Sequence, residues 1–278
     1  MPAAPDWTPV ETDLQTVRKQ YPDPLRPLAE ARVPAFVLRQ AYDPAHCAGL
    51  IQRFIDQDLM RDPRDTSGKD TRSRIDIGTS LGNLGADQER FLQHAAGTHQ
   101  LFSDLFAGFS NPVQTLYTAL QGLAPNHQVK VAREPDGRQY GPAIFRVHYG
   151  GHTYRPHIDH VVLREQRFNY AVSRYTHQFA GVLCFQNASH QGENTQAILH
   201  QCLWTPQIQP YIAAETFHQY AEENNIAQCR VDLDPGDLYF FNTRCIHEVP
   251  AIRGNLPRIV LATFIGYAPE CDEVFVWS

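Results

Sequence analysis

The sequence predicts an α+β protein that is mainly β, a double-sheet jelly roll supported by N-terminal helices. Apolar residues of the first half recur at helical spacing, whereas the second half has short runs rich in β-branched and aromatic residues, bounded by Gly, Pro or Asn. No composition break separates the halves, so we expect a single domain over residues 1–278. Its expected parts are a lead-in (1–30), a mostly helical support (31–142) and a jelly-roll core (143–267).

Each element has a local signal. Asp43 and Pro44 supply an N-cap and a first-turn proline for an amphipathic helix. Expected elements of the first half are helices at 12–20, 44–58, 86–106 and 111–123 and strands at 33–38 and 74–79. In the second half, strands are expected at 143–149, 179–187, 196–203, 227–232, 238–242 and 258–267, with a helical insertion near 206–223.

Composition and charge exclude several classes of partner. The formal net charge is −6 and the basic residues are scattered, so nucleic acid is not an expected partner. No apolar run is long enough to suggest a membrane span. The polar, proline-rich N-terminus does not resemble a signal peptide, and the cysteines form no C-x-x-C pair, so reduced thiols in the cytoplasm are expected. A small-molecule substrate is the expected partner, and the oligomeric state stays open.

The candidate chemistry begins with His157 and Asp159, which are separated by one residue. On an extended strand both side chains leave the same face and can hold one ion. The best third ligand is His247, where a strand is expected to run out into a turn. Two histidines and one carboxylate leave coordination positions free, as in non-heme iron(II) oxygenases. Taken alone, the tripeptide is better explained by surface or core residues, and zinc would use a similar ligand set.

Arg258 is a candidate anion-binding residue at the start of an apolar strand. A buried arginine is costly unless its charge is paired, and a guanidinium at this place suits the far carboxylate of a dicarboxylate ligand. The alternative is a strand-end arginine that is solvated or bridged to an acidic residue. Arg253 is a rival for the same role, but its surroundings are typical of a turn.

Together these segments resemble the Fe(II)/2-oxoglutarate dioxygenases, especially their prolyl-hydroxylase-like branch. The resemblance covers about residues 143–267. It rests, in this order, on Tyr149-Gly-Gly, His157-x-Asp159, Phe179-Ala-Gly-Val-Leu-Cys-Phe-Gln-Asn187, Gly192-Glu-Asn-Thr195, Pro235-Gly-Asp237-Leu-Tyr-Phe-Phe-Asn242, His247-Glu-Val249 and Arg258.

The resemblance implies a cupin-like double-stranded β-helix that holds iron(II) through His157, Asp159 and His247, with 2-oxoglutarate and O₂ as co-substrates. Arg258 would bind the distal carboxylate of 2-oxoglutarate. Tyr149 matches a family tyrosine that often helps to hold the same co-substrate, and a packed core tyrosine is the alternative. Halogenating relatives typically carry Gly or Ala in place of Asp159, so the carboxylate favours hydroxylation of an unactivated C–H bond.

The expected substrate is an amino acid or a natural-product intermediate. Tyr154 and His160 flank the two ligands and are expected to face it. Arg74 is a further candidate, although a strand ion pair with Asp76 explains it equally well. The long polar segment 161–178 suggests a lid or substrate loop. Two alternatives remain open: a cupin-like metal enzyme that does not use 2-oxoglutarate, and a non-catalytic binding protein on the same fold.

Overall fold

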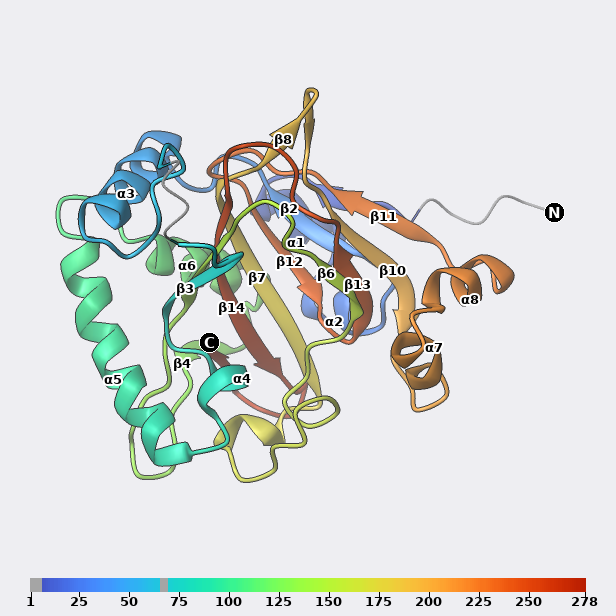
Figure 1. Ribbon diagram of the computed structural model, residues 1–278. Coiled ribbons are helices and arrows are strands. Elements are labelled where there is room, and N and C mark those ends of the chain that lie inside the picture. Colours follow the sequence, from blue (N-terminus) through green and yellow to red (C-terminus); the bar gives the residue numbers. More distant parts are fainter. Residues whose placement is uncertain (1–6, 66–69) are drawn as a thin grey trace.

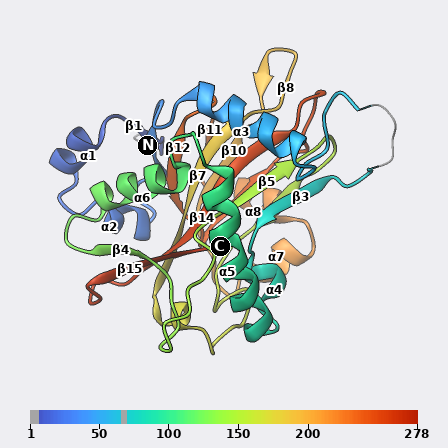
Figure 2. The ribbon, with the colours of Figure 1, turned by 90° about the vertical axis from the view of Figure 1, so that its left-hand side faces the viewer.

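The protein is described by a computed structural model that covers residues 7–65 and 70–278. Two β-sheets pack face to face, and most helices of the first half cover the outer face of the larger sheet (Figures 1 and 2). This is the predicted jelly roll, so the fold class is confirmed.

The larger sheet draws strands from the whole chain. Its nine strands are β1 (Val10–Glu11), β2 (Ala35–Leu38), β3 (Arg74–Gly78), β4 (Gln128–Val131), β5 (Ile144–His148), β7 (His177–Gln186), β12 (Leu238–Asn242), β14 (Arg258–Tyr267) and β15 (Glu273–Trp277). The order is β1-β2-β12-β7-β14-β15-β4, with β5 paired to β14 and β3 paired to β5.

The smaller sheet has four strands, in the order β11-β10-β13-β6. They are β6 (Tyr154–His157), β10 (Ala197–Leu203), β11 (Gln228–Val231) and β13 (Cys245–Val249). A separate hairpin is formed by β8 (Ser189–His190) and β9 (Glu193–Asn194).

The helices of the first half begin at side-chain caps, except for α2, which follows Pro24. They are α1 (Leu14–Gln20), α2 (Leu25–Ala29), α3 (Pro44–Asp56), α4 (Leu81–Leu84), α5 (Gln88–Leu105) and α6 (Pro112–Leu123). As predicted, the Asp43 carboxylate accepts the amide hydrogen of Ala45 and caps α3. Asn111 caps α6 in the same way through the amides of Val113 and Gln114.

An aromatic cluster joins these helices to the larger sheet. Phe145 of β5 is fully buried, and its ring centroid lies 4.8 Å from that of Phe54 and 5.7 Å from that of Phe102. Val147 and Tyr149 belong to the same core, whereas the alternate residues of β5 face the space between the sheets. One face of β5 therefore builds the core and the other is left for a site.

The first half contributes more than helical support. β2 pairs with β12, β3 with β5 and β4 with β15. The predicted boundary at residue 143, between a helical support and a jelly-roll core, therefore separates strands that belong to one continuous sheet. The predicted lead-in is packed as well, because Trp7, Val17 and Leu25 are buried.

The predicted helical insertion at 206–223 is two short helices, α7 (Gln209–Ala213) and α8 (Phe217–Glu223). They lie beside the smaller sheet, at the opposite side of the molecule from α5 (Figure 1). None of the helices in the described part of the chain is long and apolar enough to span a membrane. All six cysteines are free thiols.

Candidate active site

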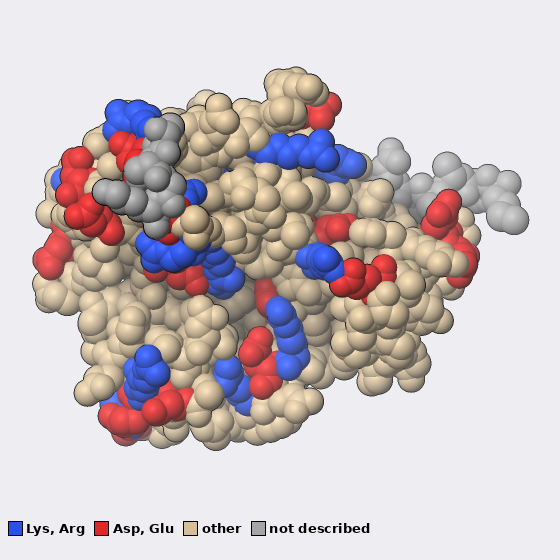
Figure 3. Space-filling view, in the orientation of Figure 1, with Lys and Arg blue, Asp and Glu red and all other residues tan. Residues whose placement is uncertain are grey.

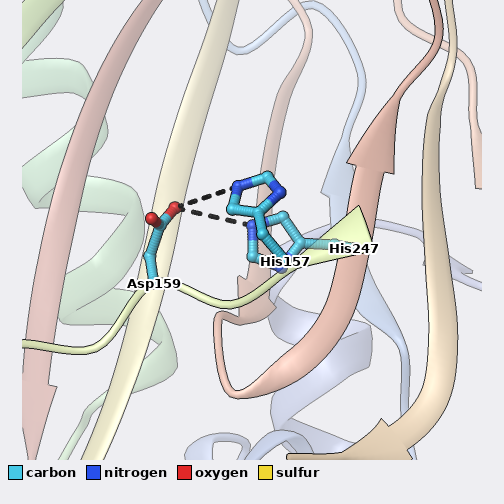
Figure 4. Close-up of side chains that lie close together, drawn as sticks. All are labelled: His157, Asp159 and His247. Carbon is cyan, nitrogen blue, oxygen red and sulfur yellow. Dashed lines mark ion pairs between the residues drawn. The ribbon is translucent and has the colours of Figure 1, made fainter. Parts of the chain in front are cut away.

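Three predicted ligands meet at one end of the smaller sheet. β13 runs antiparallel to β6 and sets His247 opposite His157, so that the two ring centroids are 4.3 Å apart. His247 lies within β13, not in the expected turn. Asp159 lies just beyond β6, where its amide donates to the Thr243 carbonyl over 3.0 Å. Figure 4 shows its carboxylate pointing toward both imidazoles.

The distances fit one metal ion. Oδ2 of Asp159 lies 3.7 Å from Nε2 of His157 and 3.5 Å from Nε2 of His247. One ligand atom from each of the three residues lies within 4.8 Å of the others. Metal–ligand bonds of roughly 2 Å place neighbouring ligand atoms at about these separations. We call these three residues the inner triad.

Backbone carbonyls fix both imidazoles of the inner triad. Nδ1 of His157 donates to the Arg155 carbonyl over 2.7 Å, and Nδ1 of His247 donates to the Cys245 carbonyl over 2.9 Å. Because a carbonyl oxygen only accepts, Nδ1 carries the hydrogen and Nε2 is left with a lone pair. This second contact is what metal-binding histidines usually make.

A loop arginine orients the carboxylate. Nη1 of Arg164 donates to Oδ1 of Asp159 and, over 2.9 Å, to the Ile158 carbonyl. One carboxylate oxygen is therefore held by a cation, while Oδ2 faces the imidazoles.

The protonation states suit metal binding. Burial alone would raise the pKa of Asp159, but hydrogen bonds and charges from His157 and His247 bring this pKa well below its ordinary value. Burial lowers the pKa of His247, and the charge of His157 adds to that shift. An ionised carboxylate and a neutral imidazole are the forms that bind a metal.

The inner triad opens on a cavity of about 330 Å³ between the two sheets. Figure 3 shows a hollow near the middle of this face, with basic and acidic side chains around it. The polar wall includes Arg74, Arg146, His148, Tyr154, His160, Arg164, Gln178 and Arg258, and the apolar wall includes Ile144, Ala180, Val182, Tyr239, Phe241 and Val260. A cavity of this size and mixed lining is typical of small-molecule sites.

Arg258 is the first residue of β14 and lies on the cavity wall with 5% of its surface exposed. Within residues 7–65 and 70–278, its guanidinium makes no hydrogen bond or ion pair, so the alternative of a bridged strand-end arginine does not hold. A buried cation without a partner is costly, and an anionic ligand would offset that cost. Its rival Arg253 is exposed in the turn before Gly254 and does not reach the cavity.

The structure corrects the prediction for Tyr149. Its side chain lies on the helical side of the larger sheet, where its hydroxyl donates to the Arg61 carbonyl over 2.9 Å. The Arg61 guanidinium stacks 4.0 Å from the ring centroid. Tyr149 is therefore a packed tyrosine. Side chains alternate along the strand, so Arg146 and His148 face the cavity and Tyr149 faces away from it.

The three predicted substrate residues all line the cavity, although their contact with substrate stays a prediction. The Tyr154 hydroxyl lies 3.0 Å from Nε2 of His148. Arg74 forms an ion pair with Asp76, with 2.6 Å between Nη2 and Oδ2, which is the strand pair that the sequence also allowed. Nδ1 of His160 accepts from the Val162 amide over 3.2 Å.

Sequence reasoning missed Arg146 and His148 as cavity residues, and it considered Arg164 only as part of a polar loop that could bind an anionic small molecule. The signal for the first two was present, because they alternate with the apolar residues of β5. Arg164 belongs to the segment 161–178, which includes the 3₁₀ helix η1 (Ala171–Arg174). This segment packs against α4, where Tyr170 donates to the Gly85 carbonyl over 3.0 Å, and it forms one wall of the cavity.

Comparison with known proteins gives the family. The family described as carrier-protein-independent halogenase WelO5 matches residues 8–278. No curated protein matches the sequence. A crystal structure of an N-substituted L-amino acid dioxygenase from Burkholderia ambifaria AMMD in complex with alpha-KG is similar in fold, with TM-score 0.58, 13% identity, and 91% of this chain and 90% of that chain covered. A second structure of an N-substituted L-amino acid dioxygenase from that organism has TM-score 0.55 and 15% identity, covering 92% of this chain and 90% of the other.

The structural likeness establishes the fold, and the family match covers nearly the whole chain. The prolyl-hydroxylase-like branch stays a prediction. The chain belongs to the WelO5 family, within the superfamily of enzymes that use iron(II), 2-oxoglutarate and O₂.

Proposed function

We propose that this protein hydroxylates an unactivated C–H bond of a small molecule. The observation that carries the proposal is that His157, Asp159 and His247 converge beside a cavity. Arg258 faces the same cavity, buried and without a partner among the described residues. A ligand set with open positions and a separate cation for a dicarboxylate are what binding of iron(II) together with 2-oxoglutarate requires.

The inner triad would hold the ion through Nε2 of both imidazoles and Oδ2 of Asp159. When bound, iron supplies the redox chemistry, and the protein orients the reactants and excludes water. Here the orienting contacts are the carbonyls of Arg155 and Cys245 and the guanidinium of Arg164.

Arg258 would bind the distal carboxylate of 2-oxoglutarate. Its neighbours on the cavity wall include the apolar side chains of Val260 and Tyr239, so little water competes for the guanidinium. A bidentate pair between a guanidinium and a carboxylate is strong in such surroundings.

Hydroxylation fits the site better than the halogenation for which the family is named. A halide that binds the iron needs a coordination position beyond those of co-substrate and O₂. Asp159 takes such a position in this chain, and Arg164 holds its carboxylate in place. We therefore expect oxygen, not halogen, in the product.

An amino acid or a natural-product intermediate suits the cavity. Arg146 faces it with Nε buried and without a hydrogen-bond partner, and Arg74 and Arg164 add positive charge to the same wall. A carboxylate on the substrate would satisfy this group.

The test is succinate formation by the purified protein with iron(II), ascorbate and 2-oxoglutarate, first without substrate and then across a panel of amino acids and related metabolites in chloride buffer. We expect a basal rate that rises with the true substrate, whose product gains the mass of one oxygen atom. A chlorinated product would overturn the choice of hydroxylation.

The same assay separates the alternative functions. Arg258→Ala is expected to raise KM for 2-oxoglutarate by about 30-fold or more, because it removes the partner of a buried charge. Arg253→Ala, at the exposed rival position, is the matched control and should leave KM unchanged. Metal-dependent turnover that Arg258→Ala does not affect would indicate a cupin-like enzyme, and no turnover with any substrate would indicate a binding protein.

A further inference from the structure

A second group of two histidines and one carboxylate lies on the other side of the smaller sheet. His200 belongs to β10, Glu248 to β13 and His218 to α8. One ligand atom from each of the three lies within 4.8 Å of the others. We call these residues the outer triad. Nothing in the proposed reaction uses them.

Strand alternation separates the two triads. In β13, consecutive side chains point to opposite faces, so His247 faces the cavity and Glu248 faces away from it. The pairing of Ile198 with Glu248 and of Leu199 with His247 puts His200 on the outer face as well. Helix α8 then brings His218 to the same place.

Both imidazoles are turned toward one carboxylate oxygen. Oε1 of Glu248 lies 3.1 Å from Nε2 of His200 and 2.8 Å from Nε2 of His218. The His200 side chain is 2% exposed and the Glu248 side chain is 11% exposed, whereas the His218 side chain is 63% exposed. The group is thus buried on the sheet side and open to solvent on the helix side.

The charge balance of this group is incomplete. Among the residues with described positions, no lysine or arginine pairs with Glu248, and its side-chain hydrogen-bond partners are the two histidines. His200 differs from the histidines of the inner triad, because its Nδ1 is buried without a hydrogen-bond partner among the described residues. Neutral imidazoles leave the buried carboxylate without a compensating cation, and that is costly.

We infer that the outer triad binds a divalent metal of the zinc type. Two imidazole nitrogens and a carboxylate oxygen are a common zinc ligand set, and a water completes four-coordination. The ion would replace two shared hydrogen bonds, neutralise Glu248 and fasten α8 to the smaller sheet. The exposed side chain of His218 gives it a route from solvent.

The test counts zinc ions per chain in the full-length protein. After removal of metals by a chelator, zinc is titrated in competition with a chromophoric chelator. We expect two zinc ions in wild type, because the inner triad also takes zinc, and one in His157→Ala/Asp159→Ala, which disables the inner triad. His218→Ala should also bind one. The control His190→Ala removes an exposed histidine of the β8–β9 hairpin and should bind two.

A second variant and a second readout guard against misfolding. Glu248→Gln keeps the shape but removes the charge, so zinc affinity at the outer triad should fall at least about tenfold. Zinc should raise the melting temperature of His157→Ala/Asp159→Ala by about 5 °C at saturating concentration, and this shift should vanish when His218→Ala is added.

Two results would overturn the inference. One is that His157→Ala/Asp159→Ala binds no zinc while its circular dichroism remains that of the folded protein. The other is that His218→Ala and Glu248→Gln still bind two zinc ions with unchanged affinity. Neither result bears on the proposed oxygenase reaction, which rests on the inner triad and on Arg258 in the cavity beside it.

Discussion

The inner and outer triads have the same donor types in different surroundings. In the inner triad, backbone carbonyls hold each Nδ1, and the ligands open on a cavity that contains an unpaired arginine. In the outer triad, both imidazoles contact one carboxylate oxygen between a helix and a sheet, and one of them is exposed to solvent. We therefore expect the donor set to let a metal bind at either triad, and the surroundings to determine whether that metal can meet a co-substrate and a substrate.

The largest expected effect separates the two triads by activity. Asp159→Ala removes an inner ligand and should lower 2-oxoglutarate turnover by at least about 100-fold, since even outer-shell partners of a metal cost 10–100-fold. His218→Ala should keep turnover within about twofold of wild type. Succinate formation with iron(II) measures both. The comparison fails if Asp159→Ala retains turnover or if His218→Ala loses it.

An intermediate effect is expected at the residue that orients the inner carboxylate. Arg164→Ala should weaken iron(II) binding by roughly 10–100-fold, because Oδ1 of Asp159 loses its cationic partner. Rescue of turnover at high iron(II) concentration would show that Arg164 acts through the metal ligand. Arg174→Ala removes an arginine of the same segment that pairs with Glu273 and is the matched control. A loss of turnover that excess iron does not rescue would contradict a positioning role.

The smallest effect is expected at a residue outside both triads. Tyr149→Phe removes one hydrogen bond to the Arg61 carbonyl and should lower the free energy of unfolding by about 1 kcal/mol. KM for 2-oxoglutarate should not change, because the side chain lies in the helical core. Denaturant unfolding and steady-state kinetics measure the two quantities. A raised KM without a loss of stability would restore the role that the sequence suggested.

Local patterns predicted much of the fold and all three residues of the inner triad. The helix cap at Asp43 and the strands of the second half could be predicted, because the interactions that favour them involve only a few neighbouring residues. His157 and Asp159 are close in sequence. His247 was found as the histidine that follows the predicted strand 238–242, although the expected turn there is strand β13. Strands β4 and β15 were missed because they are short and pair with each other from distant parts of the chain.

Two failures have a shared physical reason. The sequence placed Tyr149 on the face of β5 that carries Phe145 and Val147, but only the packing of α3 and α5 on that face shows that it is core. The outer triad has no spacing signal, because its three residues come from two strands and an inserted helix. Tertiary contacts determine both the position of Tyr149 in the core and the assembly of the outer triad, and local sequence patterns do not reveal such contacts.

Because side chains alternate along β13, neighbouring residues of this strand belong to the inner and to the outer triad. His247 and Glu248 are consecutive residues, so an ion on the outer face would restrain the backbone that presents a ligand on the inner face. Thermodynamic reciprocity then demands that zinc change the affinity for iron by the same factor by which iron changes the affinity for zinc.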